Sequence, residues 1–284
     1  MTPTSAVFRA ATELRMLGPD TFEATPQYVP WPKAYGGDLV SQSVLSAGRS
    51  VGEGFTIHSM HSYFLLPVDS EVAVRYEVER LRDGRSFRTR QVRAIQNDTL
   101  VFTALASFAV PESGTEFAED MPTGVPQPED LPPAAQTLEG VDTPAAHYWS
   151  SGRSFDMRHV PGPVYLTVDG NRAPHQAVWV KAFDALPDDP ALQAAALAYV
   201  CDYTILEPLL RQQGRAWADP DLMTASLDHA MWFHRPGRVD EWVLYAQQAS
   251  SLQNNRGLAR GMFFSREGTL LASVAQEGMI RTRR

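Results

Sequence analysis

The chain has 284 residues, of which 44% are hydrophobic and 20% are charged, and its formal net charge is −8. This length fits two ordinary domains or one large one, and the composition is that of a globular protein with a sizeable core. The negative charge argues against a nucleic-acid partner, which needs a basic face. It leaves room for a local basic pocket that takes a phosphorylated ligand.

The cysteine content and the chain ends bear on the cell compartment. One cysteine, Cys201, excludes an internal disulfide and fits a reducing compartment. Residues 1–17 lack the apolar core of a signal peptide, and no apolar run is long enough to span a membrane. Residues 281–284 are not a peroxisomal Ser-Lys-Leu signal. We therefore expect a cytoplasmic enzyme or binding protein without a membrane partner.

The first part of the chain predicts a helix followed by a meander of strands. A short helix is expected within residues 5–17 and an edge strand at 21–29. Tyr35-Gly36-Gly37-Asp38 opens a run with apolar residues at helical spacing, and Gly48 ends it. Strand-like segments follow at 56–65, 71–81, 87–96 and 99–110. This order indicates an α+β architecture rather than a parallel βαβ arrangement.

Residues 111–143 are rich in proline, and we expect a linker or surface belt there. Beyond them, strands are predicted at 164–168 and 177–182. A second helix begins with Asp189 as its N-cap and Pro190 at its first position, and it is expected to run to Arg211. Further strand-like segments lie at 222–234, 242–250, 258–265 and 270–280.

The helix-then-meander pattern occurs twice, which indicates an internal repeat. A shift of 169 positions, without gaps, superposes similar residues: Phe64 on Phe233, Pro67 on Pro236, Val74 on Val243, Tyr76 on Tyr245 and Asp98 on Glu267. The chain is predicted to consist of two tandem copies of one α+β unit.

The strand predicted at residues 224–236 has an unusual polar face. Alternation places Ala225, Leu227, His229, Met231 and Phe233 on one side, which we expect to face the core. Ser226, Asp228, Ala230, Trp232 and His234 then lie on the other side. A face that carries hydroxyl, carboxylate, indole and imidazole groups predicts the wall of a binding or catalytic site.

Asp202 is a candidate general base. It lies in the middle of the second predicted helix, on a stripe with Ala198, Tyr199, Ile205 and Leu206. Burial on such a stripe raises the pKa of a carboxyl group and makes it a better base. The alternative is a solvated residue at the edge of the stripe. Cys201 beside it is interpreted as a small buried apolar residue, not a nucleophile.

Other polar motifs carry weaker signals. Gly48-Arg49-Ser50-Val51-Gly52 matches a nucleophile elbow, but that elbow needs a strand before it and a helix after it, and here a helix comes first. His58 and His61, like His229 and His234, have odd spacing and therefore cannot chelate a metal from one strand face. His58 alone is a candidate ligand contact or, equally, a partly buried structural histidine.

The roles of Gln276 and of a cluster of arginines are not decided by the sequence pattern. Gln276 can donate and accept hydrogen bonds at once, which suits holding a water molecule. Arginines 82, 85, 88 and 90 flank the Asp83-Gly84 turn, where they either meet phosphates or form a solvated basic turn.

The chain resembles the type II acyl-CoA thioesterases, the TesB-like double-hotdog family. The resemblance covers nearly everything outside the proline-rich middle, and it rests on these runs: Ser226 to Pro236, Arg256 to Gly261, Val274 to Gly278, Tyr35-Gly36-Gly37, His58 to Leu65, Leu81 to Phe87 and Ala94 to Asn97. The run Asp228-His-Ala-Met-Trp-Phe-His234 is the most specific.

The resemblance implies a double hotdog, in which each of two antiparallel sheets wraps around a long helix. It divides the chain into an N-terminal hotdog at 1–110, a linker at 111–143 and a C-terminal hotdog at 144–284 that carries the catalytic residues. It assigns hydrolysis of acyl-CoA to Asp202, Ser226 and Gln276. The serine is a mild departure, since some members have threonine there. Gly36, Gly37 and His58 are expected to bind substrate, with Gly36 and Gly37 at a helix start that offers an oxyanion donor.

No cofactor or metal is implied. The expected substrate is acyl-CoA, and the chain is expected to form a homo-oligomer, either a dimer or a tetramer. One working site per chain is expected, because the first half has no carboxylate deep in its helix comparable to Asp202. Asp228, His229 and His234 then become candidates for support or structure. Two alternatives stay open: a hotdog enoyl-CoA hydratase and a non-catalytic acyl-CoA binding protein. Acyl length and type are not determined by the sequence.

Overall fold

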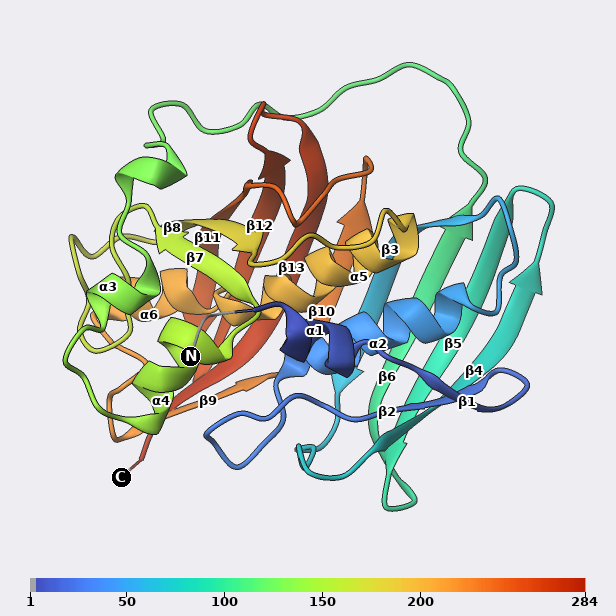
Figure 1. The fold of residues 1–284 in the computed structure, drawn as a ribbon, viewed down its shortest axis with the longest axis horizontal. Helices are drawn as coiled ribbons and strands as arrows, with labels where there is room; N and C mark the ends of the chain where they lie inside the picture. Colours follow the sequence, from blue (N-terminus) through green and yellow to red (C-terminus); the bar gives the residue numbers. More distant parts are fainter. Residues whose placement is uncertain (1–3, 284) are drawn as a thin grey trace.

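A computed structural model describes residues 4–283; the outermost residues of the two predicted hotdog ranges, 1–3 and 284, lie outside the described part. The first half holds two helices and six strands (Figure 1): α1 Ala6–Ala11, β1 Arg15–Gly18, β2 Thr21–Ala24, α2 Gly36–Gly48, β3 Thr56–Phe64, β4 Val74–Asp83, β5 Phe87–Gln96 and β6 Thr99–Ala109. Its strands pair in the order β1-β2-β4-β5-β6-β3, and every neighbouring pair is antiparallel.

The second half adds these elements: α3 Ala134–Thr137, α4 Pro144–His147, β7 Phe155–His159, β8 His175–Ala182, α5 Pro190–Val200, α6 Glu207–Gln213, β9 Leu222–Ser226, β10 Asp228–Phe233, β11 Val243–Gln253, β12 Arg256–Ser265 and β13 Leu270–Thr282. Its strands continue the same sheet in the order β10-β13-β12-β11-β8-β7, and β9 also pairs with β13. The two sheets therefore join edge to edge through β3 and β10.

The internal repeat is confirmed by the strand positions. Strands β4 and β5 begin at Val74 and Phe87, and β11 and β12 begin 169 residues later, at Val243 and Arg256. In the β3–β10 pair His61 lies opposite Ala230, its own repeat counterpart 169 residues on. A pseudo-two-fold axis therefore passes between these two residues and relates the halves.

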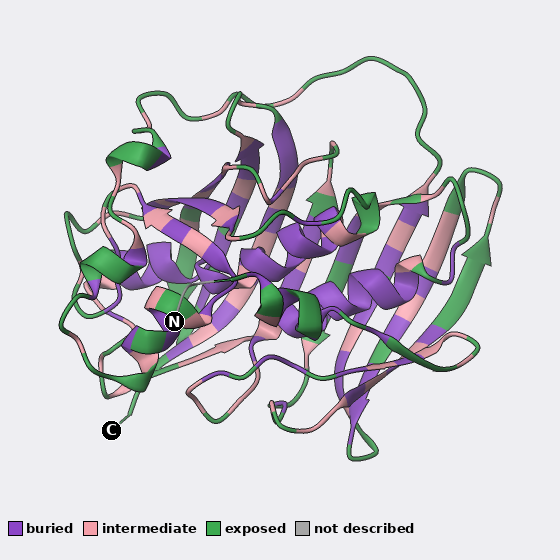
Figure 2. Ribbon diagram, viewed as in Figure 1, coloured by how far each residue is buried: buried purple, intermediate pink, exposed green. Residues whose placement is uncertain are grey.

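The main helices lie together on one face of the joined sheet. In Figure 1, α2 and α5 run side by side in front of the strands, and α2 packs most extensively against α5. Both helices are largely buried in Figure 2, and every α2 residue between its terminal glycines is buried. A helix covered on all sides has no solvent face, which explains the serines and alanines among its apolar residues. The N-terminus of α2 meets the end of α5, because Tyr35 Oη donates to Tyr199 O at 2.5 Å.

Several expected elements differ in the structure. The first predicted helix ends earlier than expected, at Ala11. Its last predicted residues belong to β1, which pairs with β2 at the edge of the sheet. No strand forms at 164–168, whereas β7 at Phe155–His159 pairs with β8 and was not expected. The second long helix is interrupted after Val200 by a 3₁₀ turn at Cys201–Tyr203. Pro208, in the first turn of α6, has no N–H to donate, so the hydrogen-bond ladder cannot run on unbroken.

Residues 110–127 form an extended segment along the outside of the molecule, ahead of the short elements near Pro128 (Figure 1). The segment contacts the second half through Trp179, whose Nε1 donates to Pro126 O at 2.8 Å. The division into 1–110, 111–143 and 144–284 stays a prediction. None of the helices within residues 4–283 is long and apolar enough to cross a membrane.

Candidate active site

Asp202 lies in the 3₁₀ turn that follows α5, so the expectation that it sits in the middle of a helix is wrong. The turn carries the carboxylate out of the helix and toward the strands. Its neighbours Cys201 and Tyr203 are buried, and Asp202 itself is partly buried.

A β-bulge brings Ser226 to the same side as His229. Ser226 pairs with Gly278 and Ala230 pairs with Ala275, so four steps along β9 and β10 match three along β13. The extra residue reverses the alternation of side chains, as bulges do. Ser226 therefore shares a face with His229, contrary to the expectation that a regular strand separates them. Asp228 is turned away and accepts the Glu277 N–H at 2.8 Å.

Asp202, Ser226 and Gln276 form a closed triangle of hydrogen bonds. Asp202 Oδ1 accepts from Ser226 Oγ at 3.0 Å and from Gln276 Nε2 at 2.7 Å. Gln276 Nε2 also lies 2.9 Å from Ser226 Oγ. Gln276 is fully buried on β13, and its Oε1 lies 2.9 Å from His229 Nδ1. Three residues predicted from separate segments thus lie in direct contact.

Burial and the neighbouring groups have opposite effects on the pKa of Asp202. Burial raises its pKa above the ordinary 3.8, while the bonds from Gln276 and Ser226, the charge of Lys33 and the Gly37 N–H oppose the rise. Lys33 Nζ donates to Thr224 O at 2.5 Å, and burial lowers the pKa of this ammonium group. Burial also lowers the pKa of His229 to about 4, so its imidazole is neutral at physiological pH.

The N-terminal half contributes the start of α2. A Cβ on Gly36 would lie 2.5 Å from Asp202 Oδ2 and 3.0 Å from the Phe64 ring. A Cβ on Gly37 would collide with Tyr199 O. Only glycine fits at both positions, so the backbone of α2 approaches the carboxylate directly. Both glycines predicted at the site are therefore brought to Asp202.

His58 lies away from this cluster. It is near the start of β3, whereas Phe64, which reaches Gly36, is at the end of that strand. His58 Nε2 lies 2.8 Å from Ser107 Oγ, and the imidazole contacts the Phe87 ring edge to face. It also lines an open groove with Trp232 and residues 112–119. Its assignment to substrate binding stays a prediction.

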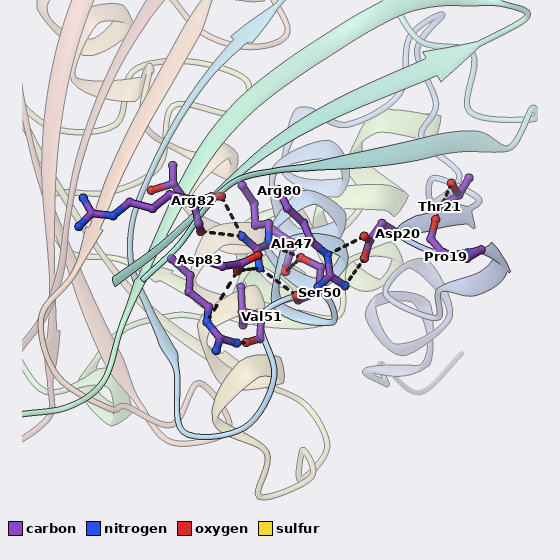
Figure 3. Close-up of polar contacts among 12 residues, drawn as sticks. Pro19, Asp20, Thr21, Ala47, Ser50, Val51, Arg80, Arg82 and Asp83 are labelled. Carbon is purple, nitrogen blue, oxygen red and sulfur yellow. Dashed lines mark hydrogen bonds and ion pairs between the residues drawn. The ribbon is translucent and has the colours of Figure 1, made fainter. Parts of the chain in front are cut away.

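Ser50, in the motif that resembles a nucleophile elbow, has a structural role. Its Oγ donates to Ala47 O at 2.7 Å and accepts from Arg90 Nε at 2.8 Å, among the contacts drawn in Figure 3. No histidine or carboxylate accepts its proton within residues 4–283. Arg82 and Arg85 are exposed, but Arg90 is fully buried and also pairs with Asp83 at 2.5 Å. The arginine turn is thus solvated only in part.

The first half also contains a buried carboxyl group, that of Asp38. It lies in the first turn of α2 and is fully buried, with Oδ2 accepting the Gln27 N–H at 3.1 Å. Burial raises its pKa well above the ordinary value. The chain ahead of α2 folds over the helix start and covers it, which the sequence pattern did not indicate. Asp38 has no hydroxyl and amide partners of the kind that Asp202 has.

Comparison with known proteins identifies the family. A model described as acyl-CoA thioesterase matches residues 151–279, and one described as acyl-CoA thioesterase N-terminal domain matches 27–109. Acyl-CoA thioesterase 2 of Haemophilus influenzae is 34% identical over 270 residues, which cover 92% of each chain.

Solved structures agree with this comparison. The acyl-CoA thioesterase II TesB2 of Mycobacterium marinum is 35% identical, with a TM-score of 0.78 over 96% of this chain and 98% of that one. A hot dog fold protein from Alicyclobacillus acidocaldarius, 19% identical, has a TM-score of 0.80 over 98% of both chains. These matches confirm the double hotdog fold. The chain therefore belongs to the type II acyl-CoA thioesterase family and is a thioester hydrolase.

Proposed function

We propose that the chain hydrolyses acyl-CoA to free CoA and a carboxylic acid at the cluster of Asp202, Ser226 and Gln276. The observation that carries this proposal is the double hydrogen bond on Asp202 Oδ1, from Ser226 Oγ and Gln276 Nε2. These two bonds orient the carboxylate, so that it can accept a proton from an attacking water molecule.

The reaction then has two steps. Asp202 takes a proton from the water molecule as the water oxygen attacks the thioester carbonyl. Ser226 helps to hold that water by a hydrogen bond, and Gln276 holds Asp202 and Ser226 in place. The C–S bond then breaks, and the proton on Asp202 passes to the CoA sulfur. Negative charge on the carbonyl oxygen requires preorganised N–H donors. The start of α2 at Gly36 and Gly37 supports this role, because its N–H groups carry the positive end of the helix dipole.

A thiol-release assay with two aspartate variants tests the proposal. Asp202→Asn keeps the shape but removes the base, and we expect kcat to fall about 10²- to 10⁴-fold. Asp38→Asn is the matched control, because Asp38 is also a buried carboxyl group near the start of α2. Burial raises the pKa of Asp38 and so disfavours its charged form, and an amide has nearly the same shape, so activity should be retained. Full activity of Asp202→Asn would show that the base lies elsewhere.

The products separate hydrolysis from the two alternatives. Free thiol indicates hydrolysis, loss of enoyl absorbance indicates hydration, and binding without turnover indicates a non-catalytic acyl-CoA binding protein. The family comparisons favour hydrolysis. A panel of acyl-CoA substrates of different length and branching identifies the acyl group that the enzyme prefers.

We also propose a cytoplasmic homo-oligomer, a dimer or a tetramer. The single buried cysteine supports a reducing compartment, and the oligomer is what the family resemblance implies. Light scattering of the purified protein measures its mass, and cell fractionation determines its compartment. A monomeric mass would contradict the proposed assembly.

A further inference from the structure

The side-chain amide of Gln276 lies between Asp202 and Ser226 on one side and His229 on the other. On one side its Nε2 lies 2.7 Å from Asp202 Oδ1 and 2.9 Å from Ser226 Oγ. On the other side its Oε1 lies 2.9 Å from His229 Nδ1. The two ends of a side-chain amide have nearly the same size, so packing alone does not fix which end faces Asp202.

The orientation of this amide matters for the site. If the amide were rotated by half a turn, Oε1 would lie where Nε2 lies, opposite the Asp202 carboxylate oxygen. Two acceptors would then face each other, and Asp202 would lose one of its two donors. A carboxylate that has lost a buried donor is less well oriented and has a different affinity for protons.

Asp202 can only accept, so it favours Nε2 on its side of the amide, and His229 supplies a donor on the other side that fits the same orientation. An amide oxygen can only accept, so the Nδ1 of a neutral imidazole that faces it carries the ring proton. The other ring nitrogen, Nε2, lies 3.6 Å from Cys201 Sγ. Burial raises the pKa of this thiol well above its ordinary value, so it stays protonated. The thiol donates to Ala198 O at 2.9 Å, so toward His229 it offers only a weak sulfur acceptor, which competes poorly with the Gln276 amide oxygen for the ring proton.

The imidazole itself has little freedom. His229 is 1% exposed and lies on β10 between β3 and β13. Its backbone is also held, since Ser62 Oγ donates to His229 O at 3.2 Å. The bulge between β9 and β10 brings its ring to the same side as Ser226. The ring nitrogen that faces Gln276 is therefore fixed by packing and strand register.

We propose that His229 is a positioning residue, whose Nδ1–H holds the Gln276 amide with Nε2 toward Asp202 and Ser226. This inference rests on the proposed function of the Asp202 cluster. His229 does not touch the reacting atoms in this scheme. It acts through Gln276, and its loss should lower kcat more than it changes KM.

Two amide variants of His229 test the proposal. In His229→Asn the side-chain NH₂ lies near the place of Nδ1 and can still donate to Gln276. In His229→Gln the NH₂ reaches the place of Nε2, near Cys201, and no longer faces Gln276. Misorientation of a reacting group costs on the order of 10- to 100-fold, so we expect kcat of the Gln variant to fall by about that factor and kcat of the Asn variant to stay within about threefold of wild type. Melting temperatures show that both variants fold.

A double-mutant cycle with Gln276→Ala separates positioning from general damage. Once the amide is absent, His229 has nothing to orient, so His229→Gln should cause little further loss in that background. An equal loss in both backgrounds, or an equal loss for His229→Asn and His229→Gln, overturns the inference. If Gln276→Ala alone keeps full activity, the proposed catalytic cluster is wrong as well, which distinguishes the two failures.

Discussion

Gly36 lies so close to Asp202 that a Cβ on the glycine would be 2.5 Å from the Oδ2 atom of the carboxylate. Gly36 belongs to the first half of the chain and Asp202 to the second. The proposed base and the helix start that faces it therefore come from different repeats. A single hotdog unit of this chain holds only part of the proposed site.

We expect Gly36→Ala to lower kcat about 100-fold, because the methyl group displaces the Asp202 carboxylate by a fraction of an ångström or more. Gly48→Ala is the control at the other end of α2, where a Cβ would meet only the Phe108 ring at 3.9 Å. That variant should keep its activity and gain up to about 0.5–1 kcal/mol of stability from the better helix former. Thiol release and thermal denaturation of both variants provide the comparison, and equal activities would contradict the role of Gly36.

The pH–rate profile should report the Asp202 carboxyl group. Burial raises its pKa above 3.8, and the carboxylate is the active form, so kcat falls as the pH drops through this raised value. The charge of Lys33 lowers the pKa of Asp202. Lys33→Met should therefore move the acid limb of the profile to higher pH. An unchanged or oppositely shifted limb would mean that another group controls the profile.

The same ionisation should reduce the stability of the fold. The pKa of Asp202 is higher in the folded than in the unfolded chain, so the folded state holds the proton more tightly. Its contribution to stability is therefore fully present below the unfolded value and is lost as the pH rises through the folded value. An amide at this position does not ionise. The melting temperature of Asp202→Asn should exceed that of wild type at pH 8, and the difference should shrink toward pH 4.

The hydroxyl group of Ser226 should be needed for activity, and threonine, which also has a hydroxyl group, should be tolerated at this position. Ser226→Ala removes the donor to Asp202 Oδ1, and a hydrogen bond to a charged group is worth about 1.5–3 kcal/mol, or about 10- to 100-fold in rate. Ser226→Thr keeps the hydroxyl and adds a methyl group that stiffens the rotamer. We expect the threonine variant to stay within about threefold of wild type in kcat; a loss as large as that of alanine would show that size matters more than the hydroxyl.

Equilibrium titration with an unreactive thioether analogue of acyl-CoA should give one site per chain. The repeat counterparts of Ser226 and Gln276, 169 residues earlier, are Ile57 and Ser107, so neither the hydroxyl of Ser226 nor the amide of Gln276 is present at its own counterpart position. Asp38 is buried in that half but accepts a hydrogen bond only from the Gln27 backbone among the contacts within residues 4–283. A stoichiometry of two would reveal a second site.

Much of the architecture follows from patterns that are local in the chain. Alternating residues, turn pairs such as Asp83-Gly84 and the ungapped repeat predict the strands of both meanders, and the structure has them. Regions with weak patterns were predicted less well. The strand β7 was missed because its partner β8 lies across a long loop, and pairing with β8 rather than local preference makes it a strand.

The sequence by itself indicated the family and the repeat. Ser226 and Gln276 lie in runs that carry the family resemblance, whereas Asp202 was singled out by its apolar neighbours in the chain. The tertiary structure decided how those residues meet. The 3₁₀ turn before Pro208 carries Asp202 out of its helix, and the bulge after Ser226 turns that side chain to the face of His229. The turn and the bulge both depend on which strand or helix end packs against them in the folded chain. A bulge is defined by the register of its partner β13, and no local pattern of residues 224–236 contains that register.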